Sequence, residues 1–246
     1  MIVWSLFDSG DSSYRKTIEK YFPSMENYSI GIDKLNKNSN FINLDLADFK
    51  EIFGENKMFN QLDQLPKPDI ILASPPCESW SVASAMQGGN KFYVWEHGNF
   101  EPRNDMSICS KNDTPFKSYP WKVLYTRVNG ELSAYNTIRI IERYKPKYWV
   151  IENPYSSHLW SYLEKQHGWS GILNKAHYSA YDDSFPKKAT GFLSNRWLSL
   201  KTTKEQAKIT VGVNADGRKQ VRDYNVRSRI PLLLVKDILE QLEEMK

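Results

Sequence analysis

A cysteine follows directly after two prolines at the end of a short apolar segment. Residues 69–73 (Asp-Ile-Ile-Leu-Ala) are bounded by turn formers and predict a buried strand. Pro75 and Pro76 fix two successive φ angles and exclude helix, so the backbone that carries Cys77 is held stiff at the carboxyl end of this strand. Ligands of open α/β sheets bind at that edge. A lone cysteine is most often a buried or incidental thiol, but this setting favours a nucleophile.

A carboxyl group repeats this layout further along the chain. Residues 148–151 (Tyr-Trp-Val-Ile) predict another strand, which runs directly into Glu152, Asn153 and Pro154. Because Cys77 and Glu152 would both lie at carboxyl ends of strands, they can face one crevice. A thiol and a carboxyl group in one crevice suit attack on an electron-poor ring carbon, with the carboxyl group bonded to a ring nitrogen. On a nucleobase this chemistry requires the base to leave the stack, although the residues alone allow other thiol chemistry.

The turn after the first predicted strand and the acid after the second suit a nucleotide-like ligand. Residues 2–7 predict a strand, and residues 8–13 turn out of it toward a helix, with Gly10 in the turn. Such a turn brings backbone N–H groups to a ligand, or it is an ordinary tight turn. Asp33 follows the second predicted strand, residues 28–32, where an acid binds the two hydroxyls of a ribose or is simply solvated.

Two further acids follow the third predicted strand, residues 41–44. Asp45 and Asp48 are both placed to accept a hydrogen bond from an adenine amino group, or to cap a helix that begins near Asp48. Glu51 stands three residues after Asp48, as in a capping box. We therefore interpret Asp48 as structural and Asp45 as the better ligand candidate.

Predicted strands alternate with predicted helices along most of the chain. Amphipathic patterns follow Ser12 or Ser13, run through residues 132–144, and follow Pro231. This alternation predicts an α/β fold with a mostly parallel sheet and helices on both faces.

Composition bounds the class of protein. The 246 residues predict one domain, or one domain with an insertion. With only two cysteines, Cys77 and Cys109, and no signal peptide, a disulfide framework is not expected and a reducing cytoplasm is. The apolar residues 2–7 are far too short to span a bilayer. We expect a cytoplasmic protein with no membrane partner and no metal.

Residues 82–130 predict a functional loop or insertion. They are rich in Gly, Asn, Pro and aromatic residues and have no sustained period. Their aromatic side chains are suited to stacking on bases or to forming a satellite core that holds the loop, and we favour the core. These residues are Trp95, Phe100, Phe116, Tyr119 and Trp121.

Positive charge gathers in the last quarter of the chain. The net charge is +4, which alone is weak evidence for a polyanionic partner. Residues 187–229 hold eleven Lys or Arg and only three acids. Within them, the turn signal at residues 214–217 separates residues 209–211 from Val221 and predicts a basic hairpin.

Together these segments resemble, in chain order, the DNA cytosine carbon-5 methyltransferases, and above all their short bacteriophage-type site-specific DNA methylases. The nucleophile motif at residues 74–77 and the glutamate motif at residues 144–154 carry the resemblance most strongly. The other matching segments are residues 7–12, 30–33, 43–45, 185–190 and 227–231.

The resemblance implies a Rossmann-like fold that binds S-adenosylmethionine and double-stranded DNA with a flipped base. It implies that Cys77 attacks carbon-6 of the cytosine while Glu152 holds N3. It assigns Lys187 and Lys188 to the catalytic group, in place of the usual arginine pair. The residues that it assigns to the cofactor are Phe7, Ser9, Gly10, Asp33, Asp45, Pro75 and Ser228. The residues assigned to DNA are Ser81, Asn153, Thr190, Lys208, Arg218, Lys219 and Arg222.

The resemblance also divides the chain. Residues 1–200 form the catalytic region with the insertion at about 82–130, residues 201–227 form a small basic recognition segment, and residues 228–246 form a helix that returns to the catalytic region. The recognition segment is too short for a large target-recognition domain, so we expect the insertion and the hairpin together to form the DNA cleft. The host would be a bacterium or a phage-infected cell.

Two alternatives stay open. A related transferase would act on RNA, on a free nucleotide or with a modified cofactor, because methyl transfer to carbon-5 needs only the same site. A non-enzyme would bind DNA or a partner without turnover, and Asp11 in the first turn, where many relatives have a smaller residue, keeps this reading open.

Overall fold

A seven-stranded sheet forms the centre of the computed structural model, which describes residues 1–81, 92–96, 99–103, 119–211, 219–221 and 228–244. Its strands, in spatial order, are β3 (Phe41–Asn43), β2 (Glu26–Gly31), β1 (Ile2–Leu6), β4 (Ile70–Ala73), β7 (Tyr148–Pro154), β9 (Ala189–Ser194) and β8 (Ile172–His177). The helices are α1 (Ser13–Tyr21), α2 (Lys57–Leu62), α3 (Pro120–Tyr144), α4 (Leu159–His167), α6 (Leu232–Glu244) and the 3-10 helices η1 (Lys50–Phe53) and η4 (Tyr178–Ala180).

The sheet is parallel except at one strand. β3, β2, β1, β4 and β7 pair in parallel, whereas β9 is antiparallel to both of its neighbours, β7 and β8. The chain winds outward from β1 to β3, then returns to place β4 on the other side of β1. This reversal creates a topological switch point between β1 and β4. The predicted Rossmann-like α/β fold class is confirmed.

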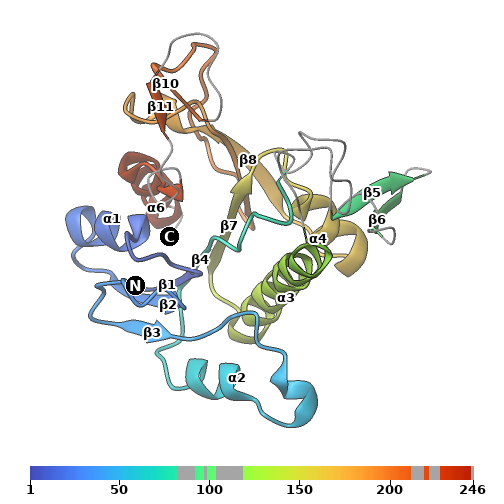
Figure 1. The fold of residues 1–246 in the computed structure, drawn as a ribbon. Coiled ribbons are helices and arrows are strands. Elements are labelled where there is room, and N and C mark those ends of the chain that lie inside the picture. Colours follow the sequence, from blue (N-terminus) through green and yellow to red (C-terminus); the bar gives the residue numbers. More distant parts are fainter. Residues whose placement is uncertain (82–91, 97–98, 104–118, 212–218, 222–227, 245–246) are drawn as a thin grey trace.

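Both faces of the sheet are covered, which explains why the central strands β1 and β4 and the first part of β7 are mainly apolar rather than alternating. Side chains alternate across each strand, so Trp4 and Leu6 join the core beneath one face while Val3 joins the other. Figure 1 shows α1 and α6 on one side of the sheet and α3 and α4 on the other. The predicted helices on both faces are therefore present.

The first helix begins where the sequence predicted. Ser12 is the N-cap of α1, and its hydroxyl accepts a hydrogen bond from the Arg15 N–H at 3.1 Å. At the other end of the chain, α6 follows Pro231 and packs against α1, burying Leu234 and Ile238.

The helix predicted from residue 132 begins twelve residues earlier, at Pro120. Its first turns lack an amphipathic period and contain Gly130, two features that hide a helix from a sequence pattern. The predicted insertion therefore ends at residue 119. Within it, β5 (Tyr93–Glu96) and β6 (Asn99–Pro102) form an antiparallel pair.

The interpretation of the insertion aromatics as a satellite core was wrong for two of them. Tyr119 and Trp121 are exposed, because they lie on the outer face where α3 begins. The side chains of Trp95, Phe100 and Phe116 lie outside the described residues. Among the described residues of the insertion, Tyr93 is buried and stacks on Trp80 with ring centroids 5.1 Å apart.

Two local predictions also need correction. The helix expected near Asp48 is the single 3-10 turn η1, in which the Asp48 carboxylate accepts from the Lys50 N–H and Glu51 pairs with Arg139 at 2.6 Å. The capping box is not formed because Arg139 of α3 takes Glu51 instead.

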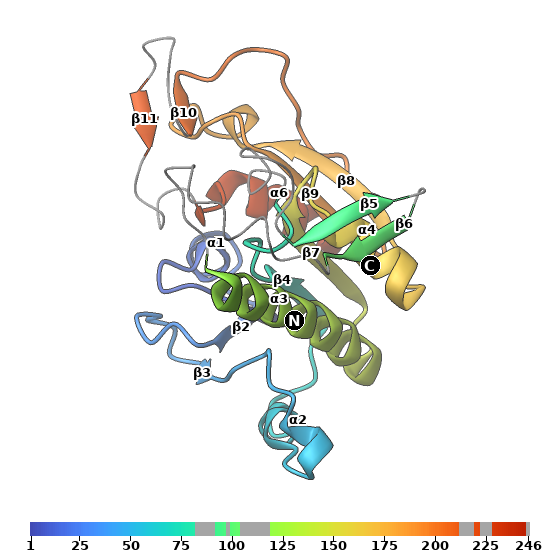
Figure 2. The same ribbon diagram turned by 45° about the vertical axis from the view of Figure 1, so that its right-hand side comes forward.

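The predicted basic hairpin is a parallel pair. β10 (Ile209–Val211) and β11 (Lys219–Val221) lie apart from the main sheet and run in the same direction (Figure 2). Turn chemistry specifies antiparallel pairing only when the loop is two to five residues long, and here seven residues separate the strands.

Among the described residues, no helix combines the length and the apolar character needed to cross a membrane.

Gly130 allows α3 to lie directly against the turn that carries the cysteine. A Cβ atom at this position would overlap the Ser79 hydroxyl oxygen and lie 3.1 Å from Trp80 Nε1. The Ser79 hydroxyl has no hydrogen-bond partner within the described ranges. The close approach therefore depends on glycine.

We expect Gly130→Ala to lower the free energy of unfolding by about 1–3 kcal/mol, because the added methyl group overpacks this contact. Chemical denaturation measures the change. Ser79→Ala alone should have little effect, and combined with Gly130→Ala it should restore most of the loss. A destabilisation that Ser79→Ala leaves unchanged would show that the helix, and not this contact, is affected.

Candidate active site

A cleft of about 1140 Å³ opens at the carboxyl edge of the sheet, beside the switch point. The ends of β1, β2, β3, β4 and β7 all contribute to its wall, as expected for an open α/β sheet. The predicted site residues that line it are Phe7, Ser9, Asp33, Asp45, Pro75, Cys77, Ser81, Glu152, Lys187, Lys188 and Ser228.

The turn that carries Cys77 is fixed by hydrogen bonds on both sides. The Cys77 carbonyl accepts from the N–H groups of Trp80 and Ser81, at 3.1 and 2.9 Å. The Asn153 amide donates to the Pro75 carbonyl at 3.0 Å. This bond ties the end of β7 to the end of β4, and so holds the glutamate strand and the cysteine turn together.

Asn153 was predicted to bind DNA, but its side chain is buried beneath the cleft and does not face it. Its side chain is 1% exposed, and its amide oxygen accepts from the Ser157 hydroxyl at 2.7 Å. Sequence reasoning could not separate these roles, because Glu152 and Asn153 alternate across the strand and only one of them can face the cleft. Asn153 positions the Cys77 turn and does not face the cleft.

The thiol of Cys77 lies in an unfavourable environment for a negative charge. Burial raises its pKa to about 11, with further contributions from the carboxylates of Glu78 and Glu152. The ammonium group of Lys188 acts in the opposite direction. In the ligand-free protein the thiol is therefore protonated near neutral pH, and a ligand or a charge change has to activate it.

Iodoacetamide alkylation tests this environment. Since the thiolate is the reactive form and the pKa is raised, we expect the rate at Cys77 to rise about tenfold per pH unit from neutral pH and to level off only near pH 11. Lys188→Met should slow the reaction at a given pH, and Glu78→Gln should speed it. A rate that levels off below about pH 9 would contradict the assigned environment.

Glu152 is held by a tyrosine that the sequence did not single out. The Tyr178 hydroxyl donates to Glu152 Oε1 at 3.3 Å, and the Lys188 ammonium lies 5.0 Å from the centre of the Tyr178 ring. Burial and the nearby Glu152 carboxylate keep the pKa of Tyr178 well above its usual value, so it stays a hydrogen-bond donor. Tyr178 follows directly after β8, at the same edge as Glu152, and this position was the available signal.

Tyr14 of α1 is a second residue that the sequence did not single out. It lines the cleft, and its hydroxyl is 2.7 Å from the Ser74 hydroxyl, just before the two prolines. Its pKa is raised by burial and then by Glu152. Tyr14 therefore joins the first helix to the cysteine turn.

The part of the cleft that contains Asp33 is built on a close approach of two loops. The Gly10 N–H donates to Asp33 Oδ2 at 2.7 Å, and the Leu35 N–H donates to Asp33 Oδ1 at 3.0 Å. A Cβ atom at position 10 would lie 2.7 Å from the Leu35 Cβ, so only glycine fits. Gly10 does not line the cleft itself and acts by orienting Asp33.

Buried polar groups brace this side from beneath. Asp8 is buried and accepts from the hydroxyls of Ser12 and Ser29, and its pKa is raised by burial although these bonds oppose the shift. Further along, the Asn136 amide of α3 donates to the carbonyls of Leu46 and Asp48, at 2.8 and 2.9 Å. These contacts fix the loops that carry Ser9 and Asp45.

Thr190 and Lys208 do not line the cleft, although both were predicted to bind DNA. Thr190 is fully buried because β9 lies between two strands, where it pairs with Pro154 and Ala176. Lys208 is exposed and pairs with Asp183 at 2.6 Å. Arg218, Arg222 and the side chain of Lys219 lie outside the described residues. Lys187 lines the cleft, but its ammonium group donates to the Lys204 carbonyl at 2.9 Å.

In the part of the chain that the structure describes, no three His, Cys, Asp or Glu side chains converge as a metal site would require.

Comparison with known proteins gives no family and one weak structural likeness. No family model matches the chain, and no curated protein sequence matches it. Among solved structures, the chain is similar to EhMeth, a methyltransferase of Entamoeba histolytica, with a TM-score of 0.41 and 16% sequence identity. The match covers 87% of this chain and 61% of that one, so this chain spans less than two thirds of the length of EhMeth.

Proposed function

We propose that the protein transfers a methyl group from S-adenosylmethionine to carbon-5 of a cytosine flipped out of DNA, through a covalent bond from Cys77. One observation carries the proposal. Cys77 and Glu152, at the adjacent ends of β4 and β7, line the same cleft as Asp33 and Asp45, at the ends of β2 and β3. A nucleophile with a carboxyl partner thus shares one cavity with the acids expected for an adenosyl group.

The cofactor half of the cleft fits S-adenosylmethionine. Asp33 is oriented by two backbone N–H groups for the ribose, and Asp45 lies one strand further along for the adenine amino group. Ile32 and Leu44 give this half of the cleft apolar walls. When bound there, S-adenosylmethionine would supply a methyl group on a positively charged sulfur.

The catalytic half of the cleft supports attack on carbon-6. The Cys77 thiolate bonds to carbon-6 while a protonated Glu152 gives its proton to N3, so electron density becomes available at carbon-5. Carbon-5 would take the methyl group from S-adenosylmethionine, which would leave as S-adenosylhomocysteine. A base would then remove the carbon-5 proton, and the bond between carbon-6 and sulfur would break to return the thiolate. The proton on N3 then returns to Glu152.

Protonation of Glu152 favours both the bond to cytosine N3 and the formation of the Cys77 thiolate. An ionised Glu152 raises the pKa of the Cys77 thiol, so its neutral form removes one of the two carboxylates that oppose the thiolate. Tyr178 holds the Glu152 carboxyl group in place, and Lys188, over the Tyr178 ring, remains as the cation near the thiol.

Covalent trapping tests the proposal. Wild-type protein, S-adenosylmethionine and duplex DNA that contains 5-fluorocytosine are incubated, and intact mass spectrometry looks for a protein–DNA adduct. Fluorine at carbon-5 cannot be removed as a proton is, so the adduct should accumulate. No adduct at saturating cofactor would overturn the mechanism. Labelled methyl transfer to duplex DNA, tRNA and dCMP, compared side by side, identifies the acceptor.

A further inference from the structure

The beginning of α3 exposes a row of aromatic side chains. Tyr119, Trp121 and Tyr125 are 51%, 59% and 67% exposed, and we call them the aromatic row. The rings touch in sequence, with centroids 6.3 Å apart from Tyr119 to Trp121 and 6.1 Å apart from Trp121 to Tyr125. Leu124 and Val128 extend the exposed surface on the same side of the helix. A continuous exposed surface of this kind marks a contact site.

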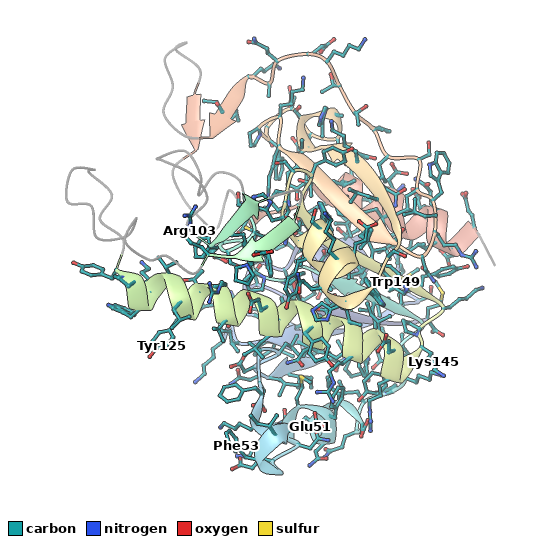
Figure 3. The ribbon with its side chains drawn as sticks, turned by 90° about the vertical axis from the view of Figure 1, so that its right-hand side faces the viewer. Glu51, Phe53, Arg103, Tyr125, Lys145 and Trp149 are labelled. Atoms are coloured by element: carbon teal, nitrogen blue, oxygen red, sulfur yellow. The ribbon has the colours of Figure 1, made fainter. Side chains whose placement is uncertain are left out.

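The aromatic row leads into the cleft. Trp121, Tyr125, Asn129 and Ser133 follow one another at four-residue spacing, which places them along one ridge of the helix. Asn129 and Ser133 line the cleft that holds Cys77. Tyr125 is only one turn from Asn129, or about 6 Å along the helix axis. In Figure 3 the end of α3 that carries Tyr125 extends beyond the strands.

The charge of this segment fits a phosphate backbone. Residues 119–130 contain two charged side chains, Lys122 and Arg127, and both are positive. Arg127 pairs with Glu131 at 3.8 Å and donates to the Arg103 carbonyl, whereas Lys122 is exposed beside Trp121. Aromatic rings with an adjacent cation are the arrangement by which proteins hold unpaired bases.

We propose that the aromatic row binds DNA by stacking on unpaired bases that flank the cytosine in the cleft. This inference rests on the proposed function, since it takes the cleft to hold a cytosine of a nucleic acid. In a fully paired duplex the faces of neighbouring bases are covered by each other. The substrate class that follows from the aromatic row is DNA that is unpaired beside its target cytosine. Such DNA binds more tightly than fully paired DNA.

Two fluorescently labelled probes test this assignment. One is a duplex with a central cytosine, and the other is the same duplex with a mismatched bubble around that cytosine. Anisotropy titrations at one fixed salt concentration give both Kd values. Wild-type protein should bind the bubble at least about tenfold more tightly than the paired duplex. Trp121→Ala/Tyr125→Ala should lose this preference and retain the wild-type Kd for the paired duplex.

Matched variants separate stacking from folding. Trp197 is 64% exposed and follows β9 at the opposite edge of the sheet, so Trp197→Ala should leave the bubble preference unchanged. Trp121→Phe/Tyr125→Phe should retain much of the preference, because the rings remain, while the quenching of tryptophan fluorescence by the bubble should decrease. Unchanged thermal unfolding confirms that the variants are folded.

The other outcomes are equally informative. A double Ala variant that keeps the bubble preference overturns the assignment, and so does a wild type without any preference. If the double Ala variant instead changes the sedimentation of the free protein and not its DNA binding, the aromatic row contacts a second copy and the assignment is wrong. If wild-type protein prefers the bubble but forms no 5-fluorocytosine adduct, the proposed methyl transfer is rejected, while the role of the aromatic row in binding unpaired DNA stands.

Discussion

Cys77→Ser should abolish the 5-fluorocytosine adduct and reduce methyl transfer to background. A serine hydroxyl is a far weaker acid than a thiol, so it needs a base to become a nucleophile. In the described part of the cleft, no histidine or lysine side chain is hydrogen-bonded to residue 77 to serve as that base. The substitution is nearly isosteric, so cofactor binding and thermal unfolding should be unchanged. Intact mass, labelled methyl transfer and calorimetry measure the three quantities.

Cys109→Ser provides the matched control, because it changes the second cysteine of the chain. This variant should form the 5-fluorocytosine adduct to the same extent as wild type. An adduct that survives Cys77→Ser and disappears with Cys109→Ser would show that the wrong thiol has been assigned.

Glu152→Gln should slow adduct formation by about 10²–10⁴-fold, the range typical of a lost general acid. The amide keeps the shape of the carboxyl group and can still bond to Tyr178, but it cannot give a proton to N3. The same substitution removes a charge that raises the pKa of Cys77. Iodoacetamide should therefore react faster with Cys77 in Glu152→Gln than in wild type at the same pH. In Glu152→Gln, the rate of adduct formation should therefore fall while the rate of alkylation at Cys77 rises.

Glu78→Gln distinguishes the charge effect from the contact with N3. Glu78 also raises the pKa of Cys77, but in the proposed reaction it has no bond to the base. This variant should react faster with iodoacetamide without the large loss of adduct formation. If both variants changed the two rates in the same way, Glu152 would act only through its charge.

The five parallel strands of the sheet could be predicted from the sequence, because most are short apolar runs that end in turn residues, whereas β8 and β9 were not predicted. The rule that ligands bind at the carboxyl ends of such strands then placed Cys77, Glu152, Asp33 and Asp45 at one edge, without any knowledge of tertiary contacts. The direction of β11 could not be predicted in this way, because pairing across a long connection depends on the surroundings and not on the turn.

The residues that sequence reasoning missed share one property: their roles depend on contacts between distant segments. Tyr178 meets Glu152 across 26 positions, and Tyr14 meets Ser74 across 60. Asn153 was misassigned because a polar residue at a strand end gives no sign of whether it faces the cleft or the core. Gly130 was placed in the predicted insertion rather than in a helix, because the packing that requires it involves Ser79, about fifty positions earlier in the chain.

The hydrogen bond from Asn153 to the Pro75 carbonyl limits motion within the site. It couples the backbone of the two strand ends that carry the thiol and the carboxyl group, so these two groups are displaced together and their separation stays constant. Entry of a base then has to widen the cleft elsewhere. The cleft wall also contains Ile209 and Thr210 of β10, a strand that does not belong to the main sheet. We expect the substrate to enter by displacement of that part of the wall, while the Asn153–Pro75 hydrogen bond keeps Cys77 and Glu152 together.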